Sequence, residues 1–123
     1  MLHEQLSEKT IAALIEVHRQ LGAGLLESTY EQCFCYELSC AGIAFERQIP
    51  VPIQYKGIKL DCGYRIDVLV ENTIIAELKS KERILPIDEA QLLTHMRLAG
   101  IRLGFLVNFK QKVLMDGLIR RVV

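Results

Sequence analysis

Residues 64–80, YRIDVLVENTIIAELKS, constrain the fold more than any other part of the chain. Two apolar runs separated by a polar ENT segment predict two buried strands joined by a tight turn. The same stretch carries Asp67, Glu77 and Lys79, three charges that a purely structural hairpin would be better without. Because side chains alternate across a strand, Glu77 and Lys79 point to one face and their apolar neighbours to the other. The register of the hairpin then decides what Asp67 faces.

Two turns are compatible with this hairpin. A two-residue turn at positions 71–72 would set Asp67 opposite Ala76 and mix charge into the apolar face. A three-residue turn at positions 71–73 sets Asp67 opposite Glu77 and keeps the apolar residues together. Register follows the buried pattern, so we favour the three-residue turn.

The favoured turn carries two further expectations. Asn72 is suited to the left-handed backbone conformation that such a turn needs. Regular alternation also sets Ile66 and Val68 together on the apolar face, with Asp67 between them on the other. Both expectations concern the backbone around the charged residues.

The remaining chain alternates between helical and strand patterns. Apolar residues with helical spacing predict a first helix that ends near Gly22 or Gly24, and a second that begins near Glu27 and ends before Gly42. From Phe45 the period changes to two. Later segments predict a sheet-edge strand with prolines 50 and 52, a turn at 56–57, a helix over 86–99, a buried strand over 101–109 and a last strand in the tail. The fold class is therefore α/β: one domain, residues 1–123, with a central mixed β-sheet flanked by α-helices.

Composition limits what the protein can do. Fifteen basic and fifteen acidic residues give zero net charge, so no global field marks a membrane or nucleic-acid binder, and any binding surface must be local. Neither an apolar stretch of ~20 residues nor a signal peptide is evident, so we expect a cytoplasmic protein without a membrane partner. The four cysteines form no CxxC pair, and we interpret Cys33, Cys40 and Cys62 as reduced, buried hydrophobes.

The two opposed carboxylates indicate chemistry. At about 5 Å between Cβ atoms on a half-buried face, Asp67 and Glu77 repel and the pKa of one of them rises. Lys79 could relieve this repulsion, and so could a divalent ion with oxygen ligands, Mg²⁺ or Mn²⁺. Such an ion beside a lysine suits phosphodiester hydrolysis, because it polarises the phosphoryl group and acidifies a water. The alternative is a salt bridge at a strand end.

Further motifs carry a resemblance to a known family. With GLLESTY at 24–30, the chain resembles the GxxExxY family, which is placed in the PD-(D/E)XK nuclease superfamily with its restriction-endonuclease-like fold. The similarity runs from about residue 21 to residue 109. Its motifs are ESTYEQCFCYEL, YKGIKLDCGYRIDVLVE, IIAELKS, EAQLLTHMRLAG and LGFLVNF.

The resemblance implies roles for individual residues. Asp67 matches the motif aspartate, Glu77 and Lys79 match the Glu-x-Lys pair, and Glu27 matches the first-helix carboxylate of many superfamily members. Gln91 matches a glutamine of exonuclease-like branches. Four residues later those branches typically have a tyrosine, and here His95 stands at that place.

Together these observations predict a small metal-dependent nuclease. Glu27, Asp67 and Glu77 would hold Mg²⁺ or Mn²⁺, Lys79 would position the attacking water, and Gln91 would belong to the site. The expected partner is nucleic acid, DNA rather than RNA, and a homodimer would help a neutral chain to assemble a basic cleft. Two alternatives stay open: a noncatalytic nucleic-acid or protein interaction module, and a metal-dependent phosphoesterase acting on nucleotides.

Overall fold

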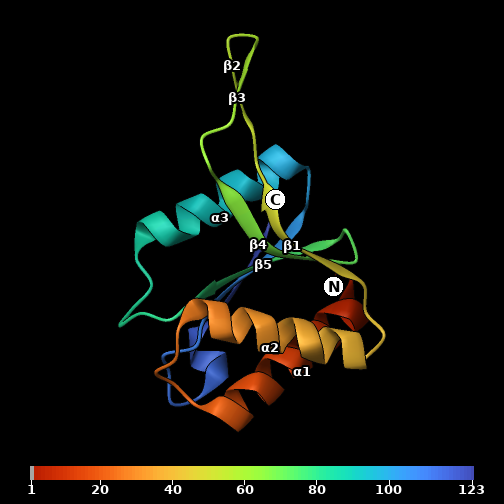
Figure 1. Ribbon diagram of the computed structural model, residues 1–123, viewed down its shortest axis with the longest axis vertical. Coiled ribbons are helices and arrows are strands. Elements are labelled where there is room, and N and C mark those ends of the chain that lie inside the picture. Colours follow the sequence, from red (N-terminus) through yellow and green to blue (C-terminus); the bar gives the residue numbers. More distant parts are fainter. Residues whose placement is uncertain (1) are drawn as a thin grey trace.

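A five-stranded sheet forms the centre of the computed structural model, which describes residues 2–123 (Figure 1). The strand order is β1-β4-β5-β6-β7, and a separate hairpin of β2 and β3 projects from one end of the body. The strands are β1 Phe45–Pro50, β2 Ile53–Tyr55, β3 Ile58–Leu60, β4 Arg65–Val70, β5 Ile74–Lys79, β6 Leu103–Asn108 and β7 Leu118–Val122. The helices are α1 Glu4–Leu21, α2 Glu27–Cys40 and α3 Pro86–Ala99, with a short 3₁₀ turn at Leu114–Gly117.

The sheet is mixed, as the sequence predicts. Strands β5 and β6 run parallel and are connected through α3, while the other neighbours pair antiparallel. A parallel pair needs a crossover, and α3 provides it. Helices α1 and α2 cover one face of the sheet and α3 covers the other, so the predicted central sheet flanked by helices is confirmed.

Each face of the sheet has its own apolar core. Ala76 and Leu78 of β5 pack with α1 and α2, whereas Ile75 packs with Leu92 and Met96 of α3. Helix α3 lies close to β6, because an added Cβ at Gly104 would stand 2.6 Å from the Met96 sulfur. The alternation of β5 therefore directs Glu77 and Lys79 toward the α3 side, as expected from the strand pattern.

The β4–β5 hairpin has the predicted register. Val70 pairs with Ile74 and Val68 with Ala76, which is the three-residue turn. Asn72 has the expected left-handed backbone with φ of 52°, and Glu71 shares it with φ of 50°. The edge position of β1 and the turn at Lys56 and Gly57 between β2 and β3 are confirmed as well.

The prediction for the cysteines is wrong in part. Cys40 and Cys62 are exposed, Cys33 is partly buried and Cys35 is buried. Cys40 is the last residue of α2, beyond its buried stripe, and Cys62 lies in the connection between β3 and β4. Both therefore lie outside the two cores. In residues 2–123, none of the helices has the length and apolar character to cross a membrane.

Candidate active site

Asp67 lies where the sheet opens. The β1–β4 ladder passes from Arg47–Val68 to Ile49–Ile66 and leaves out Asp67 and its neighbour on β1, Gln48. The β4–β5 ladder ends at Val68, and beyond it the Leu78 amide donates a hydrogen bond of 2.8 Å to Asp67 Oδ2. The Asp67 carboxylate therefore occupies the gap between diverging strands.

The opening at Asp67 changes the faces of β4. Val68 packs in the α1–α2 core, but Ile66 packs in the α3 core, so the prediction that these two residues share a face is wrong. The physical reason is the interrupted ladder: Gln48 has a φ of 50°, a left-handed backbone that regular strands do not adopt. Strain of this kind concentrates at functional sites.

Charge is poorly compensated at Asp67. Burial and, after it, the neighbouring Glu77 carboxylate raise the pKa of Asp67 to about 7, although the Leu78 amide acts in the opposite direction. The positive charge of Lys79 also lowers this pKa, but its effect is small beside that of burial. This direction agrees with two carboxylates that repel across the hairpin. A cation beside Asp67 would relieve the repulsion.

Glu77 is held from the α3 side. Its side chain is buried, and His95 Nδ1 lies 2.6 Å from Glu77 Oε1. Gln91 is exposed one helical turn before His95, and both residues line a groove beside α3. Lys79 is half-buried, and its ammonium group forms no hydrogen bond or ion pair within the part of the chain that the structure describes. Its ammonium group is therefore available to a phosphate or a water.

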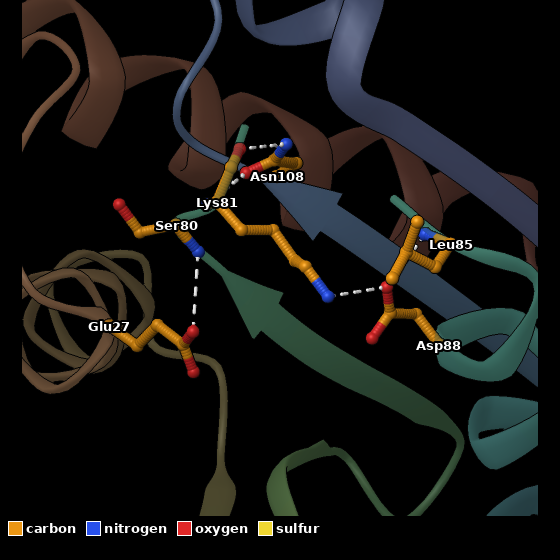
Figure 2. Close-up of polar contacts among 6 residues, drawn as sticks. All are labelled: Glu27, Ser80, Lys81, Leu85, Asp88 and Asn108. Atoms are coloured by element: carbon orange, nitrogen blue, oxygen red, sulfur yellow. Dashed lines mark hydrogen bonds and ion pairs between the residues drawn. The ribbon is translucent and has the colours of Figure 1, made fainter. Parts of the chain in front are cut away.

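Glu27 approaches from the other side of the sheet. It is the first residue of α2, and its Oε2 accepts a 3.4 Å hydrogen bond from the Ser80 amide directly after β5 (Figure 2). The Ser80 hydroxyl donates to the Leu25 carbonyl at 2.7 Å, which ties the start of α2 to the end of β5. Glu27 and Asp67 also line one hollow of about 480 Å³.

The buried hydroxyl of Tyr30 helps to fix the position of Glu27. It donates to the Gly22 carbonyl at 2.6 Å and accepts from the Leu25 amide at 3.2 Å. The ring stacks on Phe109 with 4.2 Å between centroids. Tyr30 thus fastens the connection between α1 and α2 to the core.

Sequence reasoning missed Glu31, a buried carboxylate of the same hollow. Its Oε2 accepts from Arg47 Nε and Nη2 at 3.0 and 2.7 Å, and its Oε1 accepts from Gln48 Nε2 at 2.6 Å. The four-residue spacing from Glu27 was the available signal, because it sets both carboxylates on one helix face. Through Arg47 and Gln48, Glu31 stabilises the edge strand where the ladder to Asp67 breaks.

An ion pair and several hydrogen bonds order the loop that follows β5. Lys81 Nζ contacts Asp88 Oδ2 at 2.9 Å, and the side-chain amide of Asn108 donates to the Lys81 carbonyl and accepts from its amide (Figure 2). Burial would raise the pKa of Asp88, but the Leu85 amide and the Lys81 ammonium hold it below its usual value. These contacts connect the ends of β5 and β6 to the start of α3.

The predicted metal ligands have the oxygen donors that a divalent ion needs, but their side chains are not grouped around one point. Carboxylate oxygens are the donors that Mg²⁺ and Mn²⁺ prefer. Among residues 2–123, however, no three His, Cys, Asp or Glu side chains are grouped as a metal site. Glu27 and Asp67 share the hollow, whereas Glu77 is engaged by His95.

The mixed sheet, its flanking helices and the acidic residues at its opening define a protein with a restriction-endonuclease-like fold. The family model described as PD-(D/E)XK nuclease superfamily matches residues 4–122, and the chain belongs to this superfamily. No curated protein and no solved structure matches the chain. The narrower resemblance to the GxxExxY family stays a prediction.

Proposed function

We propose that the protein is a metal-dependent nuclease that hydrolyses phosphodiester bonds, with DNA as the expected substrate. One observation carries the proposal. In a chain of this superfamily, Asp67 fills a break in the sheet beside Glu77, and its pKa of about 7 marks negative charge that the protein alone leaves uncompensated. A structural salt bridge would lower the pKa of a carboxyl instead.

Mg²⁺ is the metal that we propose, with Mn²⁺ as its substitute. Asp67, Glu77 and Glu27 would hold it, and it would polarise the phosphoryl group and acidify a bound water. Glu27 can turn toward Asp67, because its 3.4 Å contact with Ser80 is long and the side chain is exposed. His95 keeps the Glu77 carboxylate on the α3 side of β5.

Lys79 supplies the positive charge of the chain itself. It lies two residues after Glu77 on the same strand face, and its charge acts on Asp67. Its ammonium group would orient the attacking water or neutralise charge on the phosphorane-like transition state. Lys79 is therefore expected to affect the chemical step more than the binding of substrate.

Calorimetry and cleavage assays test the proposal together. Native protein and the Asp67→Asn, Glu77→Gln and Glu27→Gln variants are titrated with Mg²⁺ and Mn²⁺, then incubated with single- and double-stranded DNA and RNA. Glu8→Gln, on an exposed position of α1, is the matched control. We expect the site variants to lose metal binding and cleavage in parallel, Lys79→Ala to lose cleavage, and the control to retain both.

Three outcomes would contradict the proposal. Native protein that binds neither ion would favour the noncatalytic interaction module instead. Cleavage of mononucleotide esters without cleavage of any polymer would favour a phosphoesterase acting on nucleotides. Cleavage that survives in Asp67→Asn would mean that another site or a contaminating nuclease cleaves the substrate.

A further inference from the structure

We infer that the groove between α3 and the β2–β3 arm binds an unpaired nucleobase of the substrate strand, so that the preferred substrate is single-stranded or locally melted. The inference rests on the proposed nuclease function and deepens it. The arm is defined as residues 53–64, which Figure 1 shows projecting away from the sheet and the helices. The groove has a volume of about 430 Å³.

The groove is continuous with the candidate active site. His95 lines it and also contacts Glu77 at 2.6 Å, so a single side chain separates the groove from a proposed metal ligand. Gln91, the other α3 residue of the predicted site, lines it as well. A nucleotide with its phosphate near Glu77 would therefore have its base within reach of this groove.

The lining has the chemistry of a base site. Tyr64 is 45% exposed, and its ring lies at 61° to that of His95 with 6.1 Å between centroids, so the side chain has solvent-facing surface on which a base could stack. Ile87 and Leu98 provide apolar walls. Gln91 and Thr94 add side-chain donors and acceptors that a base edge can bind. Base–aromatic stacking of this kind tolerates every base.

Local charge is complementary to a phosphate backbone. The arm holds two basic residues and one acidic residue, and segment 79–83, which leads into the Ile87 end of the groove, holds three basic residues and one acidic residue. The arm therefore has a net charge of +1 and segment 79–83 a net charge of +2 in a chain whose total is zero, which leaves −3 on the remainder. Lys81 of the second segment is paired with Asp88, whereas Lys79 and Arg83 form no ion pair within residues 2–123. Phosphates would be attracted to both ends of the groove.

An unpaired base suits this groove better than a duplex. The bases of a duplex are stacked and their faces are hidden, so Tyr64 could not contact one unless it were flipped out. A second copy of the chain is the competing occupant, because Tyr55, Ile58 and Leu60 expose apolar surface on the arm. The charge at both ends of the groove favours the nucleic acid.

Fluorescence anisotropy with a short labelled oligothymidylate in EDTA tests the inference without catalysis. We expect Tyr64→Ala to weaken binding by at least about five-fold, the lower end of what loss of one stacked base costs, and Tyr64→Phe to bind like the native protein. Tyr36→Ala is the matched control, since Tyr36 is 67% exposed on α2, outside the groove. Thermal unfolding verifies that each variant folds.

The same proteins are then assayed for cleavage of the oligonucleotide with Mg²⁺, which separates the two proposals. Binding that depends on Tyr64 without cleavage would support the groove and contradict the nuclease. Cleavage with binding unaffected by Tyr64→Ala would contradict base binding in the groove and support the nuclease function. The inference would be overturned if Tyr64→Ala weakened the binding of a labelled duplex as much as that of the single strand, or if the native protein did not bind the oligonucleotide. It would also be overturned if the native protein were a dimer that Tyr64→Ala converts to a monomer.

Discussion

Asp67→Asn should stabilise the metal-free protein, although it removes a proposed metal ligand. A carboxyl whose pKa rises from 3.8 in the unfolded chain to about 7 in the native state disfavours folding once it is ionised. At about 1.4 kcal/mol for each pH unit of this difference, the native state loses about 4 kcal/mol at pH 8. Asparagine carries no charge, and its carbonyl oxygen can still accept from the Leu78 amide.

The sign of the pH dependence follows from linkage. Between pH 4 and pH 7 the native state binds more protons at Asp67 than the unfolded chain does, so native stability falls as pH rises through this window. The variant lacks this group and should not show that fall. The gain from Asp67→Asn is therefore absent near pH 4 and complete above about pH 7.

Urea unfolding in EDTA at pH 4.5 and pH 8 measures this difference, with Asp116→Asn, at an exposed position, as the control. Added Mg²⁺ at pH 8 should then narrow the difference in stability, because only the native protein gains binding free energy. A variant less stable than the native protein at pH 8 in EDTA would refute the reasoning. A difference that does not change with pH would refute it as well.

Three further predictions concern other parts of the molecule. Glu31→Ala should cost about 1–3 kcal/mol in urea unfolding, because Arg47 and Gln48 lose their shared acceptor; an unchanged midpoint would show that this contact contributes nothing. Gly104→Ala should lower stability by about 1–3 kcal/mol through its clash with Met96, and a neutral result would mean that the Met96 side chain simply moves aside. Light scattering should give the mass of a homodimer, since a neutral chain gains a larger binding surface by pairing; a monomeric mass would contradict this.

Local patterns predicted much of the fold. The register of the β4–β5 hairpin follows from keeping Val68 and Ala76 on one face, and the crossover between β5 and β6 follows from a helical pattern between two apolar runs. These features depend on residues that are close in sequence. The break at Asp67 was not predictable in this way, because RIDVLV reads as unbroken alternation and the interruption involves the backbone of Gln48 on another strand.

Distance along the sequence also explains which residues of the candidate site were predicted and which were missed. Asp67, Glu77 and Lys79 lie in one hairpin, so their charges are conspicuous against apolar neighbours. Glu31 and Arg47 are sixteen residues apart, and neither is unusual where it stands in the sequence; only folding makes them a buried pair. His95 is similar, since its contact with Glu77 spans eighteen residues. Contacts between elements therefore had to come from the structure.

Strand β5 explains why the site is built from both sides of the sheet. Its alternation gives Ala76 and Leu78 to the α1–α2 core and directs Glu77 and Lys79 toward α3, while its end at Ser80 contacts Glu27. Asp67 can act with both groups only because β4 leaves β5 at this point; in a continuous ladder its carboxylate could not reach the Leu78 amide. The break that weakens the sheet thus also places Asp67 between the acidic residues of the two faces. A substitution that restores regular pairing at this point should therefore raise stability and lower the proposed nuclease activity.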